Sequence, residues 1–445
     1  MMFRSAHDAE GWPAKRLAVL MLIALGLRLG VGLWLPSDRA FLERLPDQVE
    51  YLEIGSAVLE GRGFVYVDPR FPTERPVLAQ RMPGYPLLVA ACGGSVRAIR
   101  VVQAVLDTST VLATFLLARR WLAVWPSLGA GAFVALHPFL IYFTALVLSE
   151  TLYTALLAWG LLGIARPGRT GRVWWLGIAA LCLSVYARPS GAGLTVLLAI
   201  ASVFLPGRHP FAVHSRWRAP VGMTTVGLLL LTLLPWAMRN RSALGEMVWL
   251  TTNDGITLYD GWNFDNVTGG SDQGFVTQMP QLGLMNEVDR NAYLKEKAFD
   301  AIRERPGRAV ALAVKKAGRT WSPVPLSQQG QPLYVVAGLV HAVPLFGLAL
   351  AGLLSGAMSR AGKALLLLPA GYLTLVHMAS VGSVRYRLPA DPALAVLAGA
   401  GVATLLGGVA YWRNRRRADD EPGDPDDRGF EVVLERPRPQ PGTDA

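Results

Sequence analysis

Long runs of apolar residues, separated by short polar stretches, follow one another along most of the chain. About 20 apolar residues in helical form cross the hydrocarbon core of a bilayer, and in lipid the backbone polar groups must pair within their own segment. We therefore predict an all-α integral membrane protein, a multi-spanning bundle of about ten transmembrane helices. The predicted helices are residues 17–35, 97–118, 126–146, 150–165, 173–187, 189–205, 220–238, 332–356, 363–381 and 388–411.

Basic residues in the short connections indicate the orientation of these helices. Lys and Arg are enriched in cytoplasmic loops, and the basic clusters fall at every second connection if the N-terminus is inside. The clusters are Arg119 and Arg120; Arg166, Arg169 and Arg172; Arg208, Arg216 and Arg218; Arg360 and Lys363; and Arg413, Arg415, Arg416 and Arg417. Residues 1–16 are then a cytoplasmic N-terminus, 17–411 the membrane domain, and two long loops, 36–96 and 239–331, lie outside.

The first long loop contains two patterns of short helices. Residues 49–59 place apolar side chains at helical spacing, as an amphipathic helix does. Residues 86–92 are apolar but too short to span a bilayer. We expect both to be interfacial helices, with the alternative that 86–92 begins an oblique, broken span.

The second long loop and the C-terminal tail have different patterns. We predict a charged helix over 286–305, an interruption at Pro306, and a basic amphipathic helix over 308–321 on the membrane surface. There Lys315, Lys316 and Arg319 would meet lipid phosphates. The tail, 412–445, is rich in proline and acidic residues, so we predict that it is disordered.

The composition supports a membrane protein and excludes several other classes. The chain has 52% hydrophobic and 17% charged residues, against about 25% charged in soluble proteins. A net charge of +11 would suit nucleic acid, but its basic residues lie in the short connections, so we expect no nucleic-acid partner. Cys92 and Cys182 lack zinc-site spacing, and no Walker loop, dinucleotide fingerprint or zincin helix occurs.

Three acidic residues lie near ends of the predicted transmembrane helices, at the membrane surface. Asp47 and Glu50 follow the first span, and Glu150 lies between the third and fourth. An ionisable residue at the membrane edge is a functional candidate. Asp47 is either a helix cap, with Glu50 completing a capping box, or a general base. For Glu150 we favour a functional carboxylate over a role beside Ser149 in capping the fourth span.

Several arginines lie on the same predicted outer side, against the usual charge bias. Arg188 follows the fifth span, Arg385 and Arg387 precede the last, and Arg81 closes the first loop. The planar guanidinium binds phosphate through two parallel hydrogen bonds. The alternative for each is an arginine that extends to the interface. Together with the carboxylates, these arginines suit an anionic lipid-linked substrate and an acid–base reaction.

The candidate residues belong to short motifs whose order is informative. The motifs are Asp47 with Glu50-Tyr51; Arg81-Met82-Pro83-Gly84-Tyr85-Pro86; His137-Pro138; Ser149-Glu150-Thr151; Arg188-Pro189; Pro235-Trp236 with Arg239-Asn240; Thr251-Thr252-Asn253-Asp254-Gly255; and Arg385-Tyr386-Arg387-Leu388-Pro389. Their order over 17–411 resembles the polyprenyl-phosphate-sugar-dependent membrane glycosyltransferases of the GT-C fold. These include protein O-mannosyltransferases, the aminoarabinose transferase of lipid A, and bacterial relatives that glycosylate lipopolysaccharide.

The resemblance implies transfer of a sugar from a polyprenyl-phosphate donor, with inversion, to a lipid, glycan or protein on the extracytoplasmic face of a bacterial inner membrane. It implies that Asp47 is the base and that Glu150 and Glu50 assist. It also implies that Asp47 and Glu150 hold a divalent metal ion, Mg²⁺ or Mn²⁺. The residues that bind substrate would be Arg188, Arg385, Arg81, Tyr85 and Arg387.

Two departures from the family pattern leave the metal and the acceptor open. Many members carry adjacent acidic residues in the first loop, whereas Asp47 and Glu50 are three apart. The second loop lacks the large added domain of some mannosyltransferases. Two other functions remain as alternatives. A transporter or flippase would also use membrane charges, though usually near the midplane between repeats, and a scaffold would have the fold without activity.

Overall fold

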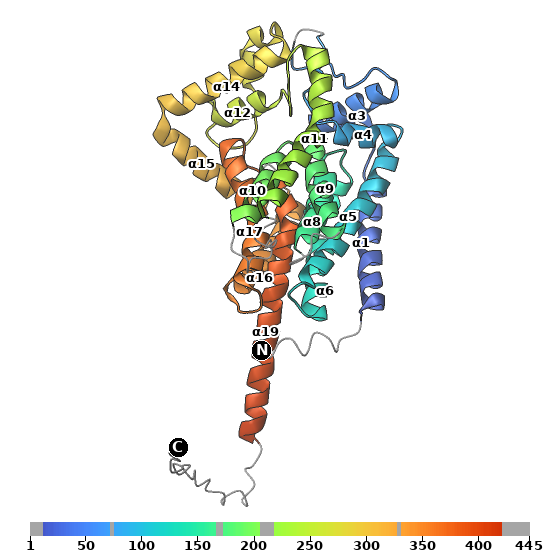
Figure 1. The fold of residues 1–445 in the computed structure, drawn as a ribbon, viewed down its shortest axis with the longest axis vertical. Helices are drawn as coiled ribbons and strands as arrows, with labels where there is room; N and C mark the ends of the chain where they lie inside the picture. The colour runs from blue at the N-terminus through green and yellow to red at the C-terminus, as the bar shows by residue number, and fades with distance from the viewer. Residues whose placement is uncertain (1–11, 72–74, 166–171, 205–217, 327–330, 421–445) are drawn as a thin grey trace, which may run out of the picture. The chain divides into compact units, whose positions relative to one another are not determined.

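The chain is described by a computed structural model that covers residues 12–71, 75–165, 172–204, 218–326 and 331–420 (Figure 1). These residues form helices and, apart from one antiparallel bridge between Tyr66 and Val77, no strand pairing. The chain divides into a large unit, Met1–Thr404, and a C-terminal unit, Leu405–Ala445. Residues 412–420, expected within a disordered tail, are instead helical, and 421–445 lie outside the described residues.

Each predicted transmembrane segment corresponds to a helix or a pair of helices. They are α1 (Ala14–Trp34), α5 (Val96–Ala118), α6 (Val124–Ala135) with α7 (Pro138–Thr144), α8 (Glu150–Ile164), α9 (Arg172–Ala187), α10 (Gly191–Phe204), α11 (Arg218–Leu244), α16 (Pro332–Leu354), α17 (Arg360–Ala379) and α19 (Asp391–Asp420). Among the described residues, six helices are long and apolar enough to cross a membrane, or seven if the bent α6–α7 pair is one span. The count of ten stays a prediction, because α8 and α9 are shorter than a full span.

The predicted span 126–146 is not one straight helix, because α6 and α7 meet at an angle of 51°. The cause is Pro138, which disfavours helical backbone at the preceding residue. Accordingly α6 ends at Ala135 and His137 caps the start of α7 with its side chain.

A buried arginine stabilises this break. The last carbonyls of a helix have no partner within it, and in lipid an unpaired carbonyl costs several kcal/mol. Arg28 donates to the carbonyl oxygens of Val134 and Ala135 at 3.0 and 2.9 Å. Its charge is balanced by Asp107 on α5, 2.6 Å away. The pair Arg28–Asp107 therefore has a structural role in joining α1, α5 and α6.

The first long loop folds into three short helices, α2 (Arg39–Leu42), α3 (Pro46–Leu59) and α4 (Gly84–Ala91). With eight residues, α4 is too short to span a membrane by itself, and among the described residues the helix pair that fits a broken span is α6 with α7. It packs closely on two neighbours through glycines. A Cβ at Gly55 of α3 would lie 2.3 Å from Val89, and one at Gly84 would lie 2.7 Å from the carbonyl oxygen of Tyr186 in α9. The first contact joins α3 to α4, and the second fixes the first loop against the bundle.

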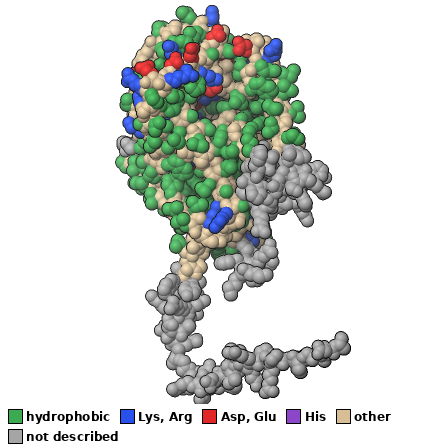
Figure 2. Space-filling model, turned by 60° about the vertical axis from the view of Figure 1, so that its left-hand side comes forward, with side chains coloured by type: hydrophobic (Ala, Val, Ile, Leu, Met, Phe, Trp, Pro, Cys, Tyr) green, Lys and Arg blue, Asp and Glu red, His purple; other side chains and the backbone are tan. Residues whose placement is uncertain are grey.

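The second long loop folds into α12 (Asp254–Trp262), α13 (Phe275–Gln278), η2 (Pro280–Gly283), α14 (Glu287–Glu304) and α15 (Pro306–Trp321). The helices predicted over 286–305 and 308–321 are present as α14 and α15, whereas α12 was not predicted. Figure 1 shows α12 and α14 at the same end of the bundle as α3 and α4. On the face seen in Figure 2, charged side chains gather at this end and hydrophobic side chains cover the bundle below.

The two long loops are hydrogen-bonded to each other. The Glu287 carboxylate accepts from the backbone N–H groups of Leu78 and Ala79 at 3.0 to 3.3 Å and from the Thr252 hydroxyl at 2.9 Å. A carboxylate with several donors makes strong, charge-assisted hydrogen bonds. Residues near the end of the first loop are thereby held against the second loop, next to Arg81.

Lys316 on α15 is buried, so the expectation that it meets lipid phosphates is wrong. Its side chain is 0% exposed, its Nζ lies 3.4 Å from the centre of the Trp262 ring, and it has no hydrogen-bond partner. Burial, with a contribution from Arg308, lowers the pKa of Lys316 to about 7. The cation–π contact offsets only part of this desolvation, so Lys316 opposes folding at neutral pH.

Lys316→Met is therefore expected to raise the thermal unfolding midpoint at pH 7 by a few degrees. The unfolded state keeps the lysine proton up to about pH 10.5, whereas the folded state releases it above about pH 7. Stability of the wild type should thus rise with pH across this range, and the variant should lose that rise. The measurement is a thermal melt at several pH values, with Lys315→Met, at an exposed position, as the control. An unchanged pH dependence in Lys316→Met would contradict this account.

Candidate active site

Six of the predicted site residues meet at one place in the structure. They come from segments far apart in the sequence: Asp47 and Glu50 on α3, Arg81 before α4, Glu150 at the start of α8, Arg188 after α9, and Arg385 on α18 (Val384–Arg387). We call these six residues the ion-pair cluster.

Arg81 connects the two carboxylates of α3. Its Nη2 donates to Asp47 Oδ1 at 2.7 Å and to Glu50 Oε2 at 2.5 Å. Three residues of helical separation place Asp47 and Glu50 on one face, which allows a single guanidinium to reach both. The Glu50 side chain is 5% exposed, but that of Asp47 is 32% exposed. Asp47 is thus the carboxylate of α3 that solvent or a substrate can reach.

Arg385 connects α3 with α8. Its Nη1 donates to Asp47 Oδ2 at 2.9 Å and its Nε to Glu150 Oε1. Arg188 donates to the same Glu150 oxygen at 2.7 Å. The other oxygen of Glu150 is buried and has no hydrogen-bond partner. A group that donates hydrogen bonds, such as a sugar hydroxyl, would satisfy that oxygen.

The charges of the ion-pair cluster cancel, with three carboxylates against three guanidiniums. Burial favours the neutral form of Asp47, but Arg81 and Arg385 outweigh it and hold the pKa of Asp47 well below its ordinary value. Burial likewise opposes the charge of Arg81, yet Glu50 and Asp47 raise its pKa well above the usual one. Asp47 is therefore ionised at neutral pH and is a weak base while both arginines bind it.

The structure excludes one of the two interpretations of Asp47, the helix cap. Helix α3 begins at Pro46 with Leu45 as its N-cap, and no side chain caps it. Asp47 is thus inside the first turn and its carboxylate binds arginines, so the capping interpretation is wrong. Ser149 precedes α8 without a capping hydrogen bond; its hydroxyl oxygen accepts instead from the Tyr51 hydroxyl at 3.2 Å.

Two other predicted site residues lie elsewhere. Tyr85 is fully buried and donates to Gln103 Oε1 at 2.8 Å. Arg387 is 1% exposed and donates to Asp391 and to the carbonyl oxygens of Thr320 and Ser322. Neither lines the cavity described next. Their geometry supports a role in positioning α4 and α18.

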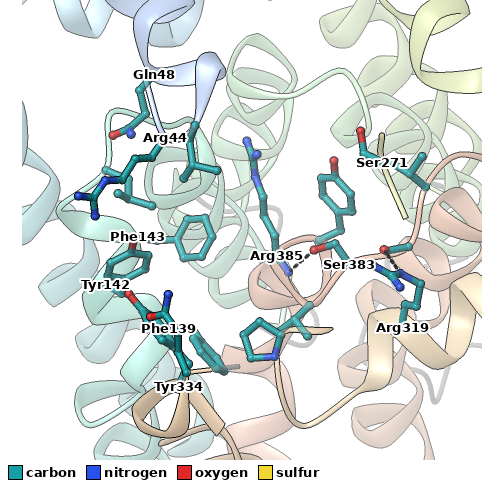
Figure 3. A pocket seen from close by; sticks show the side chains of 18 of the residues that line it. Arg44, Gln48, Phe139, Tyr142, Phe143, Ser271, Arg319, Tyr334, Ser383 and Arg385 are labelled. Atoms are coloured by element: carbon teal, nitrogen blue, oxygen red, sulfur yellow. Dashed lines mark hydrogen bonds between the residues drawn. The ribbon is translucent and has the colours of Figure 1, made fainter. Parts of the chain in front are cut away.

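A cavity of about 440 Å³ opens beside Arg385 (Figure 3). One wall is aromatic, with Phe139, Tyr142 and Phe143 on α7 and Tyr334 on α16. The polar groups that line it include Arg44, Gln48, Ser271, Arg319, Ser383 and Arg385. Ligand sites are typically apolar cavities with a few convergent polar groups, and this cavity has that character.

Tyr386 contacts both the cavity and the ion-pair cluster. It lines the cavity, stacks on His377 at 4.2 Å between ring centroids, and lies under the Arg188 guanidinium at 5.3 Å. Sequence reasoning included Tyr386 in a motif but gave it no role, and it did not single out Arg44. Arg44 could have been noticed in the sequence because it is a basic residue three positions before Asp47.

The chain resembles solved membrane-protein structures, although no family model and no curated protein matches its sequence. It is similar to the oligosaccharyltransferase AglB from Archaeoglobus fulgidus in complex with an inhibitory peptide and a dolichol-phosphate, with 14% identity and TM-score 0.55 over 92% of this chain and 52% of AglB. The Archaeoglobus fulgidus oligosaccharyltransferase in complex with Zn and sulfate has 16% identity and TM-score 0.52 over 89% of this chain and 50% of that one.

ArnT from Cupriavidus metallidurans, bound to undecaprenyl phosphate, has 14% identity over 88% of this chain and 78% of ArnT. Its TM-score of 0.37 is too low to carry an argument. The chain spans about half the length of the two oligosaccharyltransferase structures. At these identities the likeness concerns the fold. The chain has the GT-C-like, all-helical membrane fold that its motifs predicted.

Proposed function

We propose that the chain is a membrane glycosyltransferase that moves a sugar from a polyprenyl-phosphate donor to an extracytoplasmic acceptor, with inversion. One observation carries the proposal: carboxylates and arginines from five separate segments meet in the ion-pair cluster, beside a partly aromatic cavity. The GT-C-like fold supports it, because a similar oligosaccharyltransferase structure contains a dolichol-phosphate. The acceptor is a lipid, glycan or protein.

In the proposed reaction Asp47 takes the proton from the acceptor hydroxyl. The acceptor oxygen then forms a bond to the anomeric carbon of the donor sugar, and the bond from that carbon to the phosphate oxygen breaks. The phosphate leaves with the bonding electron pair, and a single displacement from the opposite side inverts the anomeric centre. Arg385 and Arg188 stabilise the charge that develops on the leaving phosphate, an effect that is strongest where water is scarce.

Arg81 and Arg385 also regulate the basicity of Asp47. Without substrate, Arg81 and Arg385 hold the Asp47 pKa low, which makes it a poor proton acceptor. A donor phosphate that binds Arg385 competes with Asp47 for that guanidinium. Loss of one cationic partner raises the pKa of Asp47, so donor binding would activate the base.

The residues as arranged do not fit a metal ion between Asp47 and Glu150. The Arg385 guanidinium contacts both carboxylates, and the two oxygens of Asp47 each bind an arginine. Among the described residues, no group of three or more His, Cys, Asp or Glu side chains is placed to hold a metal. A similar oligosaccharyltransferase structure contains Zn and sulfate, but we derive no step of this reaction through a metal.

Chelation is therefore expected to leave sugar transfer within about twofold of its untreated rate. The reason is that the arginines already supply the positive charge that a metal would provide. The rate of transfer by purified protein would be measured after EDTA treatment and dialysis. An oligosaccharyltransferase with known metal dependence would serve as the control for complete removal. Loss of transfer that Mg²⁺ or Mn²⁺ restores would contradict the arginine-based arrangement.

The proposal places the ion-pair cluster on the extracytoplasmic side, and cysteine labelling tests this. Glu296→Cys on α14 and Gly356→Cys, between α16 and α17, both introduce exposed thiols in a background without Cys92 and Cys182. A membrane-impermeant maleimide is expected to label position 296 in intact cells, and position 356 only after permeabilisation. The reverse pattern would overturn the orientation.

The alternative is a flippase for a lipid-linked anionic substrate. The two functions differ in whether the bond between sugar and phosphate breaks. Membranes that contain the protein, with their own acceptors, would receive polyprenyl-phosphate sugars labelled in the sugar. The transferase is expected to move the label to a new molecule and release the lipid phosphate. Movement of intact donor between leaflets, without release, would favour the flippase.

A further inference from the structure

We infer that His137 is a positioning residue, which holds the aromatic wall of the cavity in a fixed place relative to the helix that carries Arg385. The inference rests on the proposed function and adds to it a residue that does not line the cavity. It is carried by hydrogen bonds among His137, Arg387 and Asp391, with His341 beside them. We call these four residues the histidine–aspartate junction.

His137 joins the start of α7 to the start of α19 through its two ring nitrogens. Its Nδ1 accepts from the backbone N–H of Leu140 at 3.3 Å, and its Nε2 lies 2.9 Å from Asp391 Oδ2. Since a backbone N–H can only donate, Nδ1 carries no proton, and Nε2–H donates to the carboxylate. His137 and Asp391 are 2% and 1% exposed, so this connection is shielded from water.

Asp391 extends the connection to α18 and to the end of α15. Its carboxylate accepts from Arg387 Nε at 3.1 Å. Arg387 in turn donates through Nη1 to the carbonyl oxygen of Ser322 at 3.0 Å, just after α15. The His341 ring on α16 lies 4.1 Å from that of His137 between centroids. Segments α7, α15, α16 and α18 therefore meet at the histidine–aspartate junction.

Each of these four helices also supplies residues to the cavity. Three aromatic side chains come from α7 and Tyr334 comes from α16, while α15 supplies Arg319 and α18 supplies Arg385. The Tyr142 and Tyr334 rings meet edge to face at 5.8 Å, so the aromatic side chains of α7 and α16 pack as one wall. The histidine–aspartate junction thus determines where this wall lies relative to Arg385.

The buried pair Arg28–Asp107 shows what a purely structural role requires. It also lies at the break between α6 and α7, but it joins α1, α5 and α6. None of these three helices contributes to the cavity among the described residues. Buried ionic groups add little net stability over packed apolar residues, and their best-supported use is to fix the placement of elements. At His137 the elements so placed are those of the cavity.

Two substitutions separate the two hydrogen bonds of His137. Asn is a favoured helix cap but is too short to reach Asp391 as well, whereas Gln extends about as far as Nε2 and can donate to Asp391. We expect His137→Asn to bind undecaprenyl monophosphate about tenfold more weakly than the wild type, and His137→Gln within about threefold of it, because only Gln keeps the cavity preorganised. The dissociation constants would be measured with purified full-length protein, below the unfolding midpoint of every variant.

Arg28→Lys is the matched control, because it keeps a charge beside Asp107 but loses contacts with α6. Its unfolding midpoint should fall while its affinity for the carrier stays at the wild-type value. Weaker binding by His137→Gln than by His137→Asn would mean that His137 is only a cap and would overturn the inference, as would wild-type affinity in both variants. Sugar transfer by the wild type would leave the proposed function standing in either case. If the wild type neither binds the carrier nor transfers sugar, the proposed function fails and the inference fails with it.

Discussion

Asp47→Asn is expected to reduce sugar transfer by about 10²- to 10⁴-fold, the contribution typical of a positioned general base. The amide has nearly the shape of the carboxylate, and its oxygen can still accept from Arg81, but it does not take a proton at neutral pH. Asp47 is the most exposed carboxylate of the ion-pair cluster, so an acceptor reaches it most readily. The measurement is the initial rate of transfer in membranes with equal amounts of protein.

Glu53→Gln is the control for this variant. Glu53 also lies on α3 but is half-exposed and pairs with Arg39, so its change should leave transfer intact. Full activity of Asp47→Asn would remove Asp47 as the base. If the Asp47→Asn protein does not accumulate, Asp47→Glu is tested instead. This variant keeps the proton acceptor and should retain partial activity.

Arg385→Gln has the second large expected effect. Arg385 contacts both Asp47 and Glu150 and lines the cavity. Removal of one donor to a developing negative charge typically lowers the catalytic rate about 10²- to 10³-fold. The change also leaves Glu150, 2% exposed, with Arg188 as its remaining partner, so the variant should unfold at a lower temperature than the wild type.

A double variant separates the two effects of Arg385. Arg385→Gln with Glu150→Gln removes both of these charges but leaves Arg188 without its carboxylate partner, so stability should recover in part while transfer stays low. Arg385→Lys should keep the charge but lose the bridge between two carboxylates, and we expect partial activity. Wild-type rates in Arg385→Gln would exclude a role in stabilising the leaving phosphate. Recovery of activity in the double variant would mean that Arg385 acts only on stability.

The helical bundle was predictable because the apolar runs are long. Each predicted span corresponds to a helix or, at Pro138, to two. The bounds of α8 and α9 agree with the predicted segments 150–165 and 173–187 to within one residue, but both helices are shorter than a full span. Helix α12 was missed since nine residues with Gly255 and Gly261 give little helical signal.

The meeting of the site residues was predicted from motif order rather than from geometry. Periodicity placed Asp47 and Glu50 on one face, and Arg81 lies across that face in the structure. Sequence alone could not separate Arg385 from Arg387. The two lie on one short helix, but Arg385 reaches the cavity and Arg387 is buried against Asp391. The burial of Lys316 could not be predicted for a related reason. An amphipathic pattern does not show which basic residue packs against the rest of the protein and which lies at the surface.

In the proposed function, this protein breaks the bond between a sugar and a polyprenyl-linked phosphate. Purified protein would be incubated with polyprenyl mono- and diphosphate sugars and a membrane fraction as the source of acceptors, and the products identified by mass spectrometry. We predict equal amounts of sugar on a new acceptor and of released lipid phosphate with the wild type, and neither with Asp47→Asn. Recovery of every donor intact with the wild type, under conditions where the donors bind, would contradict the account.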